Sequence, residues 1–174
     1  MSTKQTPPLS DPFRLTGQTA VITGGATGIG YGIARCFVQA GAQVVLVGRR
    51  EVELRRAVRD LGPHAIWESC DITQGSTLPG LVERINARTG PVQILVNNAG
   101  AHLKKLALDT TEPEMSAVLQ TCLVGAFGLT CLLASDMLEA GFGSIVFIAS
   151  MTSLIGLPQV AAYSAAKSAC VAGG

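Results

Sequence analysis

The segment Thr19-Ala20-Val21-Ile22-Thr23-Gly24-Gly25-Ala26-Thr27-Gly28-Ile29-Gly30 joins a short apolar run to a glycine-rich stretch, and a helical pattern follows it. Glycine permits a sharp turn and a close approach of the backbone to a ligand. Free amides at the start of a helix offer hydrogen-bond donors and a partial positive charge to a pyrophosphate. The segment therefore predicts a phosphate-binding loop between a strand and a helix. The residues expected to contact the phosphate groups of a ligand are Gly24, Thr27, Gly28, Ile29 and Gly30.

Beyond this segment, short β-branched runs alternate with helical patterns, which is typical of βαβ units and a parallel sheet. Strands are predicted near residues 19–23, 43–47, 65–69, 92–96 and 143–149. Helices are predicted near residues 28–40, 50–60, 74–89, 112–139 and from 161 onward. Right-handed crossovers would place helices on both faces of the sheet. The predicted fold class is α/β, a Rossmann-like, doubly wound parallel sheet.

Polar or charged residues follow four of the predicted strands. Arg49 follows the second strand, Asp71 the third, Asn98 the fourth and Ser150 the fifth. In a parallel sheet these positions share the edge where the strands end, which is also where the glycine loop lies. We expect the functional site at this edge.

Four motifs resemble those of the short-chain dehydrogenase/reductase family. They are the loop Thr23–Gly30, the run Asn97-Asn98-Ala99-Gly100, the serine Ser150, and the pair Tyr163 and Lys167, which stand one helical turn apart. Their order along the chain, and the spacing between Ser150 and Tyr163, are those that the family commonly shows. The resemblance covers residues 13 to 174. It implies a nicotinamide cofactor and an oxidoreductase.

The second predicted strand ends in Val47-Gly48-Arg49-Arg50, where an acidic residue usually binds the adenosine ribose of NAD. Without that carboxylate a 2′-phosphate meets no repulsion, and the Arg49 guanidinium suits it as a partner. We therefore expect NADP as the preferred cofactor, with NAD as the alternative. The simpler interpretation is that Arg49 and Arg50 begin a solvated helix beside Glu51 and Glu53.

By resemblance, Asp71 and the backbone of Ile72 bind the adenine, Asn98 lies near a ribose, and Gly100 allows the chain to pass close to the cofactor. Asp71 also suits an N-cap of the next helix, and both roles remain open.

The chemistry expected of this family requires a proton donor. Tyr163 fits this role, because a free phenol has a pKa of about 10 and a neighbouring ammonium such as that of Lys167 favours the phenolate. By resemblance, Lys167 also binds the nicotinamide ribose and Ser150 binds the substrate oxygen. Thr152 and Ser153 are rivals to Ser150. The expected function is hydride transfer between the cofactor and a carbonyl or secondary alcohol, such as a 3-oxoacyl or sugar-acid compound.

The sequence departs from the family pattern at two places. Cys122 occupies the position where many members have a catalytic asparagine, and a thiol is a poor substitute for an amide. We also expect a C-terminally truncated member that lacks the later strands and the substrate lid, because the sequence ends at Gly174. The alternative function is a non-catalytic relative that binds nucleotide or associates with full-length subunits.

The composition favours a small molecule as the ligand of this protein. A net charge of +1 without long basic runs argues against nucleic acid or an anionic membrane surface. The apolar stretch 115–135 contains too many polar residues and glycines for a membrane span, so we expect it to pack between the sheet and another subunit of a homodimer or homotetramer. Residues 1–12 are expected to be a flexible tail without a signal-peptide pattern, ahead of a single domain at 13–174.

The 5 cysteines and 2 histidines lack metal-ligand spacing, so no metal site is expected. Four of the cysteines lie in apolar or small-residue surroundings, which favours reduced core residues and a cytoplasmic location.

Overall fold

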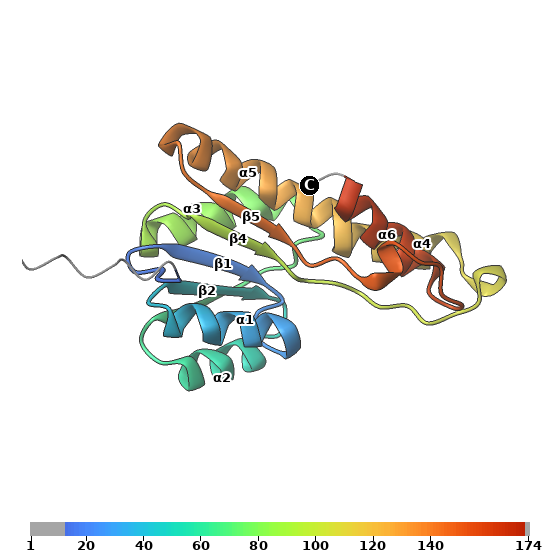
Figure 1. The fold of residues 1–174 in the computed structure, drawn as a ribbon, viewed down its shortest axis with the longest axis horizontal. Helices are drawn as coiled ribbons and strands as arrows, with labels where there is room; N and C mark the ends of the chain where they lie inside the picture. Colours follow the sequence, from blue (N-terminus) through green and yellow to red (C-terminus); the bar gives the residue numbers. More distant parts are fainter. Residues whose placement is uncertain (1–12, 173–174) are drawn as a thin grey trace, which may run out of the picture.

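The computed structural model describes residues 13–172 as a five-stranded parallel sheet in the order β3-β2-β1-β4-β5, with helices on both faces (Figure 1). The strands are β1 (Thr19–Thr23), β2 (Gln43–Gly48), β3 (Ala65–Ser69), β4 (Ile94–Asn97) and β5 (Ser144–Phe147). The helices are α1 (Gly28–Gln39), α2 (Glu51–Leu61), α3 (Leu78–Thr89), α4 (Glu112–Leu119), α5 (Gly125–Ala140) and α6 (Ala161–Ala172). This confirms the predicted fold class. The expected tail at 1–12 lies outside the described residues.

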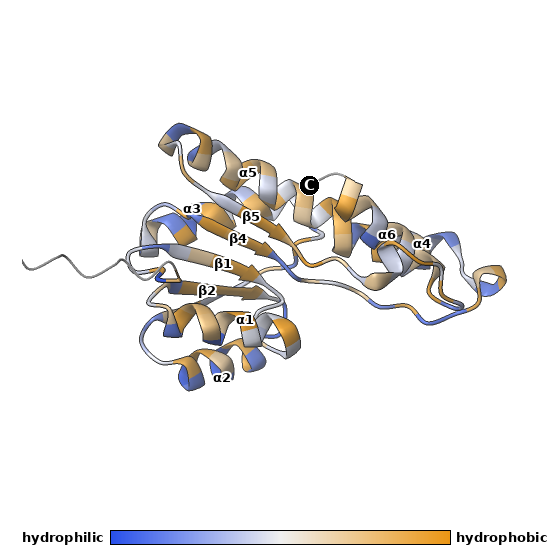
Figure 2. Cartoon of the chain, viewed as in Figure 1, coloured by the Kyte–Doolittle hydropathy of each residue, from blue (hydrophilic) through white to orange (hydrophobic). Residues whose placement is uncertain are grey.

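Alternate side chains of the central strands bury on opposite faces of the sheet, as the pleat requires. On one face Ile22 and Leu46 pack with Leu54 of α2 and other apolar side chains of α1. On the other face Val21 packs with Leu129 of α5 and with α3. Burying each large aliphatic side chain stabilises the fold by about 1.5–3 kcal/mol. Figure 2 shows the result as a band of apolar strands between amphipathic helices.

The chain order of the strands creates the crevice that the site uses. β1 lies at the centre and pairs with β2 on one side and with β4 on the other. From β1 the chain continues through β2 to the edge strand β3 and then crosses to β4 on the other side of β1. The connections that follow β1 and β4 therefore leave the carboxyl edge of the sheet in opposite directions. In doubly wound sheets ligands bind at this point.

Glycines end several helices as the sequence indicates. α5 stops at Ala140, and Gly141 takes the left-handed conformation with φ of 65°. Helix boundaries differ from the prediction at residue 74, because Gly75–Thr77 forms a 3₁₀ turn (η1) ahead of α3.

The predicted helix at 112–139 contains a π-helical turn (η3, Gln120–Val124) between α4 and α5. The turn was not predicted. It adjoins a tight contact, since a Cβ on Gly125 would lie 2.4 Å from the Ile72 carbonyl oxygen. α5 packs against α3 on the sheet, whereas α4 packs against α6 beyond the ends of the strands (Figure 1).

The continuous helix Glu112–Ala140 is long and apolar enough to cross a membrane by length and composition, and 33% of its most apolar stretch is buried within the chain. Its packing against another subunit stays a prediction. Phe127 of α5 is 57% exposed, and Ile145 and Val146 of the edge strand β5 are also exposed.

Candidate functional site

The loop between β1 and α1 is a tight turn held by its own backbone. Gly24 and Gly28 have φ of 64° and 56°, which favours glycine at both positions. A Cβ on Gly30 would lie 2.5 Å from both the Gly24 carbonyl and the Asn98 amide nitrogen. Thr27, which precedes α1, makes no side-chain cap. The first amides of α1 are therefore available to a ligand.

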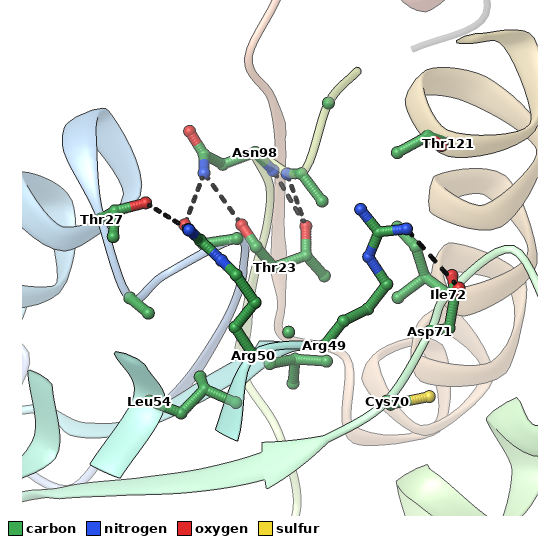
Figure 3. Close-up of a pocket in the computed structure, with 16 residues that line it drawn as sticks. Thr23, Thr27, Arg49, Arg50, Leu54, Cys70, Asp71, Ile72, Asn98 and Thr121 are labelled. Atoms are coloured by element: carbon green, nitrogen blue, oxygen red, sulfur yellow. Dashed lines mark hydrogen bonds and ion pairs between the residues drawn. The ribbon is translucent and has the colours of Figure 1, made fainter. Parts of the chain in front are cut away.

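Asn98 holds this loop from the end of β4. Its side-chain amide donates to the carbonyls of Thr23 and Gly24 at 2.9 and 3.2 Å. The Thr23 hydroxyl accepts hydrogen bonds from the backbone amides of Asn98 and Ala99, both at 3.0 Å. The loop after β4 and the glycine loop are thus one connected unit (Figure 3).

These loops enclose a cavity of about 290 Å³ at the carboxyl edge of the sheet. Seven of the residues predicted to bind a cofactor line it: Gly24, Thr27, Arg49, Asp71, Ile72, Asn98 and Gly100. Gly28 and Gly30 shape the turn behind it, whereas the Ile29 side chain is 67% exposed and does not line it.

Two arginines from the end of β2 project into the cavity (Figure 3). The Arg49 guanidinium lies 3.8 Å from the Asp71 carboxylate. The Arg50 guanidinium donates to the Thr27 hydroxyl at 3.4 Å. The sequence interpretation named only Arg49 as a cofactor residue. Arg50 stands at the start of α2 and reaches the glycine loop through a tertiary contact that the sequence does not reveal.

Asp71 lines the cavity but is not the N-cap of the next helix. Its carboxylate accepts hydrogen bonds from the backbone amide and the hydroxyl of Thr73, at 3.1 and 2.8 Å. Partial burial alone would raise the pKa of Asp71, but these hydrogen bonds and the Arg49 charge hold that pKa below its ordinary value. Asp71 therefore orders the turn after β3 rather than capping α3, which starts later in the chain.

Tyr163 and Lys167 lie on α6, next to the cavity rather than in its lining. The Lys167 ammonium is 5.8 Å from the centre of the Tyr163 ring. Lys167 is only 3% exposed, and its ammonium donates a hydrogen bond to the Ile148 carbonyl. A buried ammonium thus stands beside the phenol, as the sequence spacing indicates.

Ser150 lies in the loop that joins β5 to α6. Its hydroxyl accepts hydrogen bonds from the amide and the hydroxyl of Thr152, at 3.2 and 3.0 Å. The Ser168 hydroxyl donates to the Ser153 carbonyl at 3.0 Å, which fixes this loop against α6. Thr152 and Ser153, the two alternative candidates for the role of Ser150, therefore help to position it.

A model of the short chain dehydrogenase family matches residues 18–172. The chain belongs to the short-chain dehydrogenase family. Its membership implies a nicotinamide cofactor and an oxidoreductase fold, as the four motifs indicate.

Individual relatives agree with this assignment. The oxidoreductase asL5 of Sarocladium schorii is 37% identical over 156 residues, which cover 90% of this chain and 63% of the relative. The NADP-dependent (R)-specific alcohol dehydrogenase of Lentilactobacillus kefiri is 35% identical over 159 residues, with the same two coverages of 90% and 63%. The crystal structure of a putative gluconate dehydrogenase from Agrobacterium tumefaciens superposes with a TM-score of 0.86 at 32% identity, covering 90% of this chain and 63% of that one. The chain spans less than two thirds of each of these proteins.

Cys122 takes a specific place in this short-chain dehydrogenase. The Ala101 amide donates to its sulfur at 3.3 Å, and the sulfur lies 3.6 Å from the Ala101 carbonyl. Behind it, the Cys170 thiol donates to the Cys122 carbonyl at 3.3 Å. The thiol at the asparagine position therefore anchors the loop after Gly100.

The prediction of four core cysteines was wrong. Cys122 and Cys170 are buried, Cys70 is half-buried, and Cys36 and Cys131 are exposed. Small apolar neighbours in the sequence indicate a helix, but they do not show on which side of that helix a cysteine lies. Within residues 13–172, no three His, Cys, Asp or Glu side chains gather as a metal site requires.

Proposed function

We propose that the chain carries the site of an NADP-preferring oxidoreductase that transfers hydride between the nicotinamide and a carbonyl or secondary alcohol. The contact at Gly100 supports this most directly. Gly100 lines the cavity, and a Cβ placed on it would lie 3.8 Å from the Lys167 ammonium. Gly100 thus brings the cavity lining close to the Lys167 ammonium, which supports a cofactor that reaches α6.

The residues of the cavity suit a dinucleotide. The free amides of the glycine loop and of α1 suit the pyrophosphate, and Asp71 with Ile72 suits the adenine. When bound, the cofactor supplies or accepts the hydride, and the protein supplies position and electrostatics.

The charge at the ribose end favours NADP over NAD. The two residues that directly follow β2 are Arg49 and Arg50, and both border the cavity. Because the Arg49 side chain is 70% exposed, it is free to turn toward a phosphate at little cost. Paired guanidinium donors suit a phosphate dianion.

The proton chemistry falls to α6 and the loop before it. In the reduction direction Tyr163 gives its proton to the substrate oxygen, Lys167 favours the phenolate that remains, and Ser150 holds that oxygen. The compounds expected as substrates are of the 3-oxoacyl or sugar-acid type.

The test is binding followed by turnover. Melting of the purified chain is followed with NADPH and with NADH, since a ligand of the native state raises stability. Turnover is measured with ethyl acetoacetate and NADPH, and with gluconate and NADP⁺. Tyr163→Phe is expected to abolish turnover and leave the NADPH-dependent melting shift intact, whereas the control Tyr31→Phe retains both. Absence of a shift with either nucleotide would exclude the cofactor site.

A second candidate is a nucleotide-binding subunit that associates with copies of itself or with longer relatives. Exposed apolar residues on η3, on α5 and on the edge strand β5 favour it: Val124, Phe127, Leu138, Ile145 and Val146. Light scattering tests it, since a homodimer or homotetramer is expected and a monodisperse monomer would contradict self-association.

A further inference from the structure

The rings of His102 and Tyr163 are in contact. Their centres lie 4.9 Å apart and their planes are tilted by 57°. This ring separation is short enough for one water to bridge an imidazole nitrogen and the phenol oxygen, and such a bridge carries a proton as a direct hydrogen bond does. Tyr163 is half-buried, whereas His102 is exposed to solvent. The contact therefore joins the expected proton donor to the outside of the protein.

The loop that carries His102 is held on both sides of it. Ala101 is bound through its amide to the Cys122 sulfur, and Ala101 and Leu103 pack in the cluster that includes Tyr163. Further along, the Lys105 amide donates to the Gln159 carbonyl at 2.7 Å, just ahead of α6. These anchors fix the backbone of the loop relative to the helix of Tyr163, so the ring contact does not depend on a free loop.

Two polar groups on the inner side of the site already have hydrogen-bond partners. The Cys122 carbonyl accepts the Cys170 thiol, and the Lys167 ammonium is bound to the Ile148 carbonyl. Tyr163 packs in a cluster with Cys122 of η3 and with Met115 and Leu119 of α4, and the Lys167 ammonium lies 5.8 Å from the centre of its ring. His102 contacts the Tyr163 ring, is exposed to solvent, and carries an imidazole, the side chain most often used for proton transfer.

We propose that His102 is a second proton-exchanging group of this site, paired with Tyr163, through which the tyrosine hydroxyl exchanges its proton with solvent. This rests on the proposed function. In the reduction direction Tyr163 gives its proton to the substrate oxygen and becomes a phenolate. The imidazolium of His102 then gives its N–H proton to that phenolate, and the neutral imidazole takes up from solvent the one proton that the reduction consumes. The hydride comes from NADPH, so the step needs no further reactant.

The first test does not depend on turnover. The chain has 2 histidines, so the carbon-bound imidazole protons give two sets of NMR signals, assigned with His64→Gln. The His102 signals are expected to respond to the ionisation of Tyr163 and to lose that response in Tyr163→Phe. The His64 signals serve as the internal control. A His102 titration that is the same in both proteins would overturn the proposal.

The second test separates proton exchange from ring packing. With ethyl acetoacetate and NADPH, His102→Ala and His102→Phe are each expected to lose about 100-fold in kcat, the lower end of what a positioned proton-transfer group contributes, with little change in KM. Added imidazole should restore turnover to His102→Ala but not to His102→Phe, whose ring fills the space. Full turnover in His102→Phe would show that only packing matters and would overturn the proton route.

His64→Gln is the matched control and is expected to keep the kinetics of the unaltered chain. If the unaltered chain turns over neither ethyl acetoacetate nor gluconate, the proposed function fails, and the NMR titration alone decides whether the pair exists.

Discussion

Arg49 and Asp71 form an ion pair of 3.8 Å across the cavity, with the arginine at the end of β2 and the aspartate just after β3 (Figure 3). The strand β2 (Gln43–Gly48), which ends just before this arginine, carries no carboxylate. A bound 2′-phosphate would compete with Asp71 for the same donor, since a guanidinium offers several N–H groups.

Replacing Arg49 or Arg50 by alanine should weaken NADPH binding selectively. Hydrogen bonds to charged groups contribute about 1.5–3 kcal/mol, so each change should raise the Kd for NADPH by roughly tenfold or more while the Kd for NADH stays nearly constant. Titration with nicotinamide fluorescence measures both constants. Arg56→Ala is the control, because Arg56 is exposed on α2 outside the cavity lining. Equal losses for both nucleotides would exclude a phosphate-specific role.

Gly30→Ala should damage the glycine loop. Its new methyl group would meet the Gly24 carbonyl and the Asn98 amide at 2.5 Å, and such overpacking costs about 1–3 kcal/mol. Urea unfolding measures the loss of stability, and the NADPH-dependent shift in melting temperature measures the loss of cofactor binding. Gly32→Ala lies in the same helix with nothing within 4 Å of its Cβ, so it should stabilise the chain by about 0.5–1 kcal/mol. Similar effects at both glycines would contradict the close packing of the loop.

Acid should destabilise the chain partly through Glu114. The Thr111 amide, the Lys105 ammonium and the Thr111 hydroxyl hold the pKa of Glu114 at about 2, below its ordinary value of 4.5. A depressed pKa contributes stability above the unfolded-state value, and that stability is lost as the pH falls through the folded value. Melting temperatures recorded between about pH 5 and pH 2 should therefore fall less steeply in Glu114→Gln. Glu139→Gln on α5 is the control, and an unchanged slope in Glu114→Gln would refute the assignment.

Thiol labelling should distinguish the exposed cysteines from the buried ones. Iodoacetamide is expected to modify Cys36 and Cys131 first, because both are exposed. Cys122 and Cys170 should react only after unfolding, and burial also raises the pKa of the Cys170 thiol, which lowers its thiolate fraction. Mass spectrometry of peptides locates the label. Early modification of Cys170 would contradict the packing of α6 against η3.

The strands were predictable because each is a short apolar run bounded by a glycine or a polar residue. β1 lies where the run Thr19–Thr23 placed it, and β3 matches the predicted 65–69. The carboxyl edge followed from topology alone, since parallel strands end on one side. This is why Arg49, Asp71 and Asn98, which are distant in sequence, line one cavity.

The remaining features depend on contacts that periodicity does not encode. The π turn adjoins the close approach of Gly125 to the Ile72 carbonyl, which is a tertiary contact. The pairing of His102 with Tyr163 depends on how Cys122 holds the intervening loop. Arg50 was placed with the solvated start of α2 because its reach back to Thr27 is not visible in sequence.

The π turn at Gln120–Val124 changes the direction of the side chains on one part of the long helix relative to the other part. In a regular helix each residue advances the side-chain direction by about 100°, so the wider turn shifts the face that α5 presents relative to that of α4. The first part is thus oriented for α6 and the second for the sheet. Deleting one residue here would keep the helix but turn one of its two buried faces toward solvent. The length of this turn, more than its composition, therefore limits which insertions and deletions the chain tolerates.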